Sequence, residues 1–157
     1  MNYHTHYNYS GDTGISGKHR ARINRDTEFL QSYRRVLDLM LEHRVPDARR
    51  AAVDFTIMNG HPRYHVSYDR AYVVVRSIIR NNKVPVKPSM QALMWLEIAS
   101  KVKKLIEREQ VTLPHALQFV LDHCRASRYY ITPQYAYNHI RHISKTPSKN
   151  TRYDHHN

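Results

Sequence analysis

One stretch of the chain occurs twice, and this internal repeat restricts the possible folds more than any other feature of the sequence. Residues 63–78 read RYHVSYDRAYVVVRSI and residues 128–143 read RYYITPQYAYNHIRHI, and six of the sixteen aligned positions are identical. The identical pairs are Arg63/Arg128, Tyr64/Tyr129, Ala71/Ala136, Tyr72/Tyr137, Arg76/Arg141 and Ile78/Ile143. We therefore expect one small structural unit to be used twice.

The segments around the repeat have the apolar spacing of α-helices. Between residues 29 and 41, apolar side chains recur at steps of three and four, which gives a helix one apolar face. Asp26 or Thr27 is placed to cap this helix. Further helix starts are marked by a capping side chain or a first-turn proline at Pro46, Ser67, Ser89, Thr112 and Thr132. The sequence therefore predicts an all-α fold.

The predicted helices group into two units, a linker and two tails. We expect two tandem units of three helices, one formed by residues 26–80 and the other by residues 89–144. We expect the two units to pack with pseudo-symmetry around a shared core. Residues 81–88 contain two prolines and no helical pattern, which indicates a linker. Residues 1–25 predict a mobile, polar and basic arm, and residues 145–157 predict a polar tail, since neither has apolar periodicity.

The charge balance favours a polyanionic partner. The 157 residues include 25 Lys and Arg against 13 Asp and Glu, a formal net charge of +12. An excess of this size on a short chain attracts polyanions. We expect nucleic acid as the partner, with DNA favoured over RNA. Acidic protein subunits are the less favoured partner, and a basic surface without a specific partner is the simplest alternative.

Several features argue against a membrane or secreted protein. No apolar run approaches the roughly 18–20 residues of a membrane span, and the first 14 residues lack the apolar centre of a secretion signal. Cys124 is the only cysteine, so the chain cannot form an internal disulfide. We expect a cytoplasmic protein, or one inside a virion, without a membrane partner.

A three-helix unit whose last helix follows a turn has the outline of a helix-turn-helix DNA-binding protein. In such a protein, Gln, Asn and Arg contact base edges, while Lys and Arg contact phosphates. The exposed faces of the repeated helices and the basic arm supply the candidate nucleic-acid-binding residues, which are Lys18, Arg20, Arg22, Arg25, Arg63, Arg70, Arg76, Arg80, Arg128, Gln134, Asn138 and Arg141. A helical repeat with solvated polar faces would explain the same pattern.

The repeated Arg-Tyr pair allows two interpretations. Tyr64 and Tyr129 suit the core of their units, as repeated aromatic residues beside apolar positions usually do. Arg63 and Arg128 precede a helix start, so each could meet a phosphate near the positive end of that helix. A structural role, in which each arginine pairs with a carboxylate or caps a carbonyl, is the equal alternative.

The sequence contains no pattern that predicts catalysis or a metal site. Among the 12 histidines, His139 and His142 have ligand-like spacing, but no acidic or thiol side chain accompanies them as a further ligand. Phosphate-binding loops and nucleophile motifs do not occur in the sequence. We therefore expect no enzyme, no metal and no cofactor.

The two copies of the motif also resemble a known group of proteins. In Pro62–Ala71 and Ala126–Ala136, Arg-Tyr, an aromatic residue or His, Val or Ile, and Ser or Thr precede an Ala-Tyr pair. This pattern resembles small basic helical proteins of Bacteroidetes phages and mobile elements. The resemblance implies a DNA-related role in a phage or an integrated element, and it assigns no functional residue.

These observations predict a non-enzymatic nucleic-acid-binding protein, most simply a duplex-DNA-binding regulator or accessory factor of a phage or mobile element. The alternative is a structural or adaptor component of a large assembly, such as a virion or a ribonucleoprotein, docked through its basic surface. A regulator should prefer particular DNA sequences, whereas an assembly component should bind by charge alone or with a protein neighbour.

Overall fold

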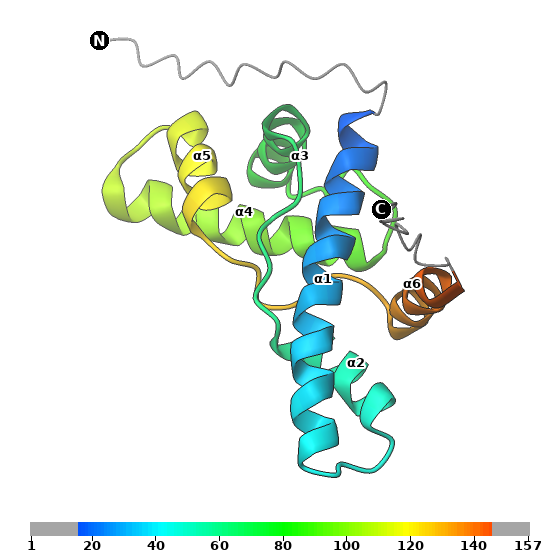
Figure 1. The fold of residues 1–157 in the computed structure, drawn as a ribbon. Helices are drawn as coiled ribbons and strands as arrows, with labels where there is room; N and C mark the ends of the chain where they lie inside the picture. Colours follow the sequence, from blue (N-terminus) through cyan, green and yellow to red (C-terminus); the bar gives the residue numbers. More distant parts are fainter. Residues whose placement is uncertain (1–15, 146–157) are drawn as a thin grey trace, which may run out of the picture.

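The computed structural model describes residues 16–145, and the regular secondary structure of this part of the chain is entirely α-helix (Figure 1). The helices are α1 (Gly17–Glu42), α2 (Ala48–Asn59), α3 (Tyr68–Asn81), α4 (Met90–Glu109), α5 (Leu113–His123) and α6 (Pro133–Lys145). The predicted all-α class is confirmed. Residues 1–15 of the predicted arm, and all of the predicted tail beyond residue 145, lie outside the described residues.

Short polar side chains mark where the helices begin. The Ser67 hydroxyl accepts a hydrogen bond from the Arg70 amide, 3.3 Å away, and Ser89 does the same for Ala92 at 3.4 Å. Thr132 Oγ1 accepts from the amide of Tyr135. Each bond satisfies an amide that has no partner inside its own helix. The helix starts predicted at these three residues are confirmed.

The predicted mobile arm is wrong for residues 17–25, because they form the first turns of α1. Ser16 caps this helix, so neither Asp26 nor Thr27 does. Asp26 is instead buried and accepts a 2.5 Å hydrogen bond from the hydroxyl of Tyr135 on α6. Arg25 pairs with Asp26 at 2.9 Å and lies over the Tyr135 ring. These contacts join the end of the basic stretch to a distant segment of the chain.

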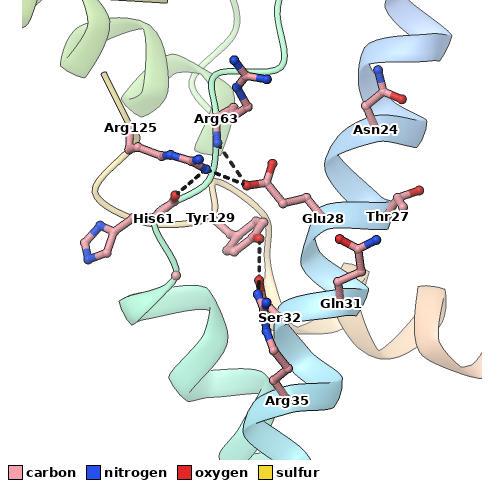
Figure 2. Close-up of a pocket in the computed structure, with 11 residues that line it drawn as sticks. Asn24, Thr27, Glu28, Gln31, Ser32, Arg35, His61, Arg63, Arg125 and Tyr129 are labelled. Atoms are coloured by element: carbon pink, nitrogen blue, oxygen red, sulfur yellow. Dashed lines mark hydrogen bonds and ion pairs between the residues drawn. The ribbon is translucent and has the colours of Figure 1, made fainter. Parts of the chain in front are cut away.

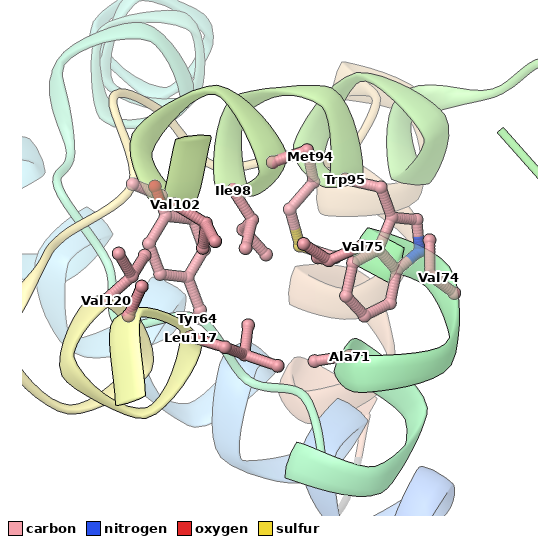
Figure 3. Close-up of a cluster of buried hydrophobic side chains, with 13 residues drawn as sticks. Tyr64, Ala71, Val74, Val75, Met94, Trp95, Ile98, Val102, Leu117 and Val120 are labelled. Carbon is pink, nitrogen blue, oxygen red and sulfur yellow. The ribbon is translucent and has the colours of Figure 1, made fainter. Parts of the chain in front are cut away.

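The structure has two hydrophobic cores, and each combines helices from both halves of the sequence. In the first core, α3 packs on α4 and α5 around Val75, Ile98 and Leu117 (Figure 3). In the second core, α1 and α2 pack on each other, and α6 packs on α2. The third helix of each half therefore packs with the first two helices of the other half.

This exchange differs from the predicted grouping of residues 26–80 and 89–144 into separate three-helix units. Consecutive helices α2 and α3 do not pack closely on each other, and neither do α5 and α6, so the expected helix-turn-helix pairs are not formed. The physical reason is the length of the connections. Residues 60–67 and 124–132 form no helix, and they are long enough to carry the next helix beyond its own half.

The two connections, residues 60–67 and 124–132, are joined by hydrogen bonds where they cross. The amide of Ala126 donates to the Pro62 carbonyl at 2.8 Å, and the amide of Tyr129 donates to the Ile57 carbonyl at 2.9 Å. His61 Nδ1 lies 3.1 Å from the Ala126 carbonyl oxygen. These bonds satisfy backbone groups that the helices leave unpaired, and they join the two cores.

Tyr64 and Tyr129 are both buried, as predicted, and each reaches a core of the other half. The Tyr64 hydroxyl donates to Glu97 Oε2 on α4 at 2.7 Å. The Tyr129 hydroxyl lies 3.2 Å from Ser32 Oγ on α1. The repeated tyrosines therefore anchor the crossing connections.

Candidate nucleic-acid interface

A groove of about 920 Å³ lies between the first turns of α1, the crossed connections, and the starts of α3 and α4. Its deepest side chains are apolar or aromatic, and they include Tyr64, Met94 and Trp95, each less than a tenth exposed. Val66 and Val86 also line it. The groove therefore has an apolar base. We call these five side chains (Tyr64, Val66, Val86, Met94 and Trp95) the floor.

The upper walls of the groove are cationic. Six of the candidate nucleic-acid-binding residues line it, and they are Lys18, Arg22, Arg25, Arg63, Arg70 and Arg128. No Asp or Glu occurs among the described residues that line this groove. We call these six residues the rim. Arg25 is partly neutralised by its ion pair with Asp26, but no described carboxylate belongs to the lining itself, and such a concentration of one sign of charge attracts anions.

Local geometry explains why these side chains converge. Lys18, Arg22 and Arg25 are spaced at four and three residues, so they share one face of α1. Arg63 lies on an extended segment in which side chains alternate between the two sides. Its neighbours Pro62 and Tyr64 are buried, so Arg63 is exposed. Helical spacing thus orients Lys18, Arg22 and Arg25, and the alternation of side chains along the segment orients Arg63.

Two helix N-termini also open on the groove. Ser16 and Ser67, the caps of α1 and α3, both line it. The amides of a first helical turn have no partner within the helix and carry a partial positive charge. Backbone amides therefore add to the attraction that the rim side chains exert on a phosphate.

Two rim arginines lie against tyrosine rings. Arg25 lies 5.0 Å from the ring centroid of Tyr135, and Arg128 lies 5.9 Å from that of Tyr130. Burial raises the pKa of both tyrosines, so their hydroxyls stay protonated to a higher pH than usual. These contacts restrict the guanidinium groups.

The remaining candidates lie away from the groove. Arg76 and Arg80 are exposed on α3, and Arg20 is half-buried on α1. On α6, Gln134, Asn138 and Arg141 are exposed, and Gln134 Nε2 donates to Asn138 Oδ1 at 3.0 Å. The structure therefore separates the candidates into one converging group and others outside it.

A second pocket, of about 600 Å³, adjoins α1 and holds Glu28 (Figure 2). Glu28 accepts hydrogen bonds from the Arg63 amide at 3.3 Å and the Arg125 guanidinium at 3.2 Å, and it contacts His65 Nε2 at 2.5 Å. Both connections are thus tied to α1 by one carboxylate. We interpret this cluster as structural, because it fixes the rim residue Arg63 in place.

A further polar cluster supports the groove from below. Glu97 accepts from the hydroxyl of Tyr64 and from the Ser127 amide, and Lys101 Nζ donates to the same hydroxyl at 2.8 Å. Burial opposes the ionisation of Glu97, but the hydrogen bonds from Ser127 and Tyr64 and the nearby Lys101 charge outweigh it and lower its pKa. This arrangement satisfies the polar end of a buried tyrosine.

The sequence did not single out several lining residues, namely His19, His65, Gln91, Trp95 and Tyr130. One signal was present: the repeat aligns His65 with Tyr130, directly after the repeated Arg-Tyr pair. No sequence pattern pointed to Trp95 and Gln91 as lining residues. They line the same groove as α1 only because the third helices are exchanged between the halves.

Three comparisons with known proteins, and searches of the described residues for a metal site and a membrane span, gave no match. No protein-family model, curated protein or solved structure matches the chain. Among residues 16–145, no group of three or more His, Cys, Asp and Glu side chains could hold a metal ion. None of the helices described here is long and apolar enough to cross a membrane.

Proposed function

We propose that the protein is a non-enzymatic nucleic-acid-binding protein, and that the groove is its main contact with phosphates. One observation carries the proposal: six cationic side chains and two helix N-termini surround a groove that no described carboxylate lines. Phosphate contacts of this kind dominate the affinity of proteins for nucleic acids.

In its more specific form, the proposal is a duplex-DNA-binding regulator or accessory factor of a phage or mobile element. Side chains suited to base edges support it. Gln134, Asn138 and Arg141 share an exposed stretch of α6, and these residue types make base contacts in known complexes. The exchanged helices require a binding mode other than the standard helix-turn-helix arrangement, in which the reading helix packs on its predecessor.

A second candidate is a structural or adaptor component of a virion or ribonucleoprotein. Exposed apolar side chains favour it. Phe55 and Met58 on α2 are 49% and 55% exposed, and Leu93 and Leu96 on α4 are 50% and 44% exposed. Where such side chains gather into a contiguous patch, the patch is typical of a surface that contacts another protein.

A salt titration of binding to duplex DNA tests the proposal. Each phosphate neutralised by a cationic side chain contributes about −0.9 to the slope of log affinity against log salt concentration. If all six rim residues meet phosphates, the slope is about −5. A flat slope, or no binding at low salt, would contradict nucleic acid as the partner. Sequence preference over competitor DNA separates the regulator from the assembly component.

A further inference from the structure

We infer that the groove binds a single-stranded segment of nucleic acid, with phosphates on the rim and an unpaired base on the floor. This inference depends on the general form of the proposed function, nucleic-acid binding at the groove, and it names a single strand as the ligand of that site in place of the duplex of the more specific form. It adds a contact that a duplex cannot make.

The floor is the first reason. Trp95, Met94 and Val86 are apolar, and a phosphate placed against them would lose its hydration without gaining a hydrogen bond. A ligand made only of phosphates would therefore leave the floor uncovered. The rim attracts negatively charged groups, and the floor favours contact with an apolar surface. The groove therefore suits a ligand that carries both negative charge and an apolar surface.

A nucleobase matches the chemistry of the floor. It has a flat apolar face that stacks on aromatic side chains and a polar edge that forms hydrogen bonds. Tyr130 is half-buried and provides aromatic surface, and Trp95, which is 5% exposed, adds only the small part of its ring that reaches the groove. Gln91 lies beside them, with Nε2 3.5 Å from the Tyr130 carbonyl oxygen, and it brings an amide to the lining. Stacking and edge recognition are therefore available at one place.

The arrangement of the rim favours a strand over a mononucleotide. Lys18, Arg22 and Arg25 belong to α1, whereas Arg63 and Arg128 belong to the two connections. Cationic side chains thus come from several elements around the floor. Successive phosphates of a strand can meet several of them at once, and proteins that bind single strands combine a cationic groove with stacking residues in this way.

A duplex cannot reach the floor. Its bases are paired and stacked inside the double helix, so a base enters a protein pocket only when it is unpaired or flipped out. The groove, at about 920 Å³, is within the size range of small-ligand pockets, roughly 300–1,000 Å³. A duplex can therefore contact the rim only, while a single strand can contact the rim and the floor.

The chain carries its own reporter for this test. Trp95 is the only tryptophan of the sequence and lies in the floor. The full chain is titrated with four probes that are compared at equal total phosphate concentration: a single-stranded oligonucleotide, the same strand with abasic sites, the corresponding duplex, and inorganic polyphosphate. We expect the intact strand to bind most tightly and to change Trp95 fluorescence, and the abasic strand to bind about tenfold or more weakly.

A pair of valine variants locates the base. Val86 lines the groove on the connection between α3 and α4, and Val84 lies on the same connection outside the lining. Val86→Asp places a carboxylate on the floor, and Val84→Asp makes the same charge change elsewhere. We expect Val86→Asp to remove the difference between intact and abasic strands, and Val84→Asp to preserve it. Equal helical circular dichroism of both variants controls for folding.

The outcomes distinguish the two proposals. If intact and abasic strands bind equally at low salt, or polyphosphate or duplex binds as tightly as the intact strand, the floor takes no base. This inference then fails while nucleic-acid binding by charge remains. If none of the four probes binds at low salt, the proposed function fails as well. Equal effects of Val84→Asp and Val86→Asp would also contradict the inferred base position.

Discussion

Gly60, at the start of the first connection, lies against the ring of Tyr129 from the second connection. A Cβ atom at this position would lie 2.4 Å from Cε2 of Tyr129 and 2.6 Å from the Thr56 carbonyl oxygen. The Tyr129 ring has little freedom to move, because it is 1% exposed and its edge meets the Phe29 ring at a centroid distance of 5.2 Å. The absence of a side chain at Gly60 therefore permits the crossing.

We predict that Gly60→Ala destabilises the protein by about 1–3 kcal/mol, the usual cost of forcing extra volume into a packed core. Gly17→Ala is the matched control, because a Cβ there meets no atom within 4 Å. In a helix this control should be neutral or slightly stabilising. Urea unfolding followed by circular dichroism measures both. Equal stability of the two variants would contradict the described crossing.

At the scale of helices, α1 illustrates the limit of local sequence patterns. The caps Ser67 and Ser89 were predictable, because a capping side chain and its amide are neighbours in sequence. The start of α1 was not, because residues 17–25 have little apolar periodicity. The end of this stretch contacts Tyr135, more than a hundred residues away in the chain. Local propensity cannot reveal a contact at that separation.

This contact between α1 and α6 leads to a prediction with an internal control. Tyr135→Phe removes the hydrogen bond to buried Asp26 and should cost about 1.5–3 kcal/mol, as for hydrogen bonds to charged groups. Tyr137→Phe removes a buried hydroxyl that has no hydrogen-bond partner among the described residues, so it should be neutral or stabilising. Thermal or urea unfolding compares them. A larger loss for Tyr137→Phe would contradict the docking of α1 on α6.

At the scale of the whole molecule, the exchange of third helices decides where the groove forms. Helical periodicity predicted which face of α3 is apolar, and that face is buried, but it could not predict which partner the face meets. The rim was partly predictable from the basic residues and the repeat. The floor was not, because Trp95 and Val86 reach the groove only when α3 packs on α4.

The exchange also predicts how halves of the chain behave. Residues 16–81 and 90–145, produced as separate fragments, should each lack a cooperative unfolding transition, because each has lost the partner of its third helix. Mixed together, they should recover helical circular dichroism and a single transition. Cooperative folding of either fragment alone, without a gain on mixing, would show that consecutive helices form independent units.

The central claim is that the rim of the groove holds nucleic-acid phosphates, and the salt dependence of two double variants tests it most directly. Arg22→Gln with Arg70→Gln removes two rim charges, and Lys103→Gln with Lys104→Gln removes two exposed charges of α4 outside the groove. The account predicts that the rim variant makes the log–log salt slope shallower by about 1.5–2, while the α4 variant leaves it close to that of the unaltered protein. Equal slopes for the rim variant and the unaltered protein, or the larger change in the α4 variant, would contradict it.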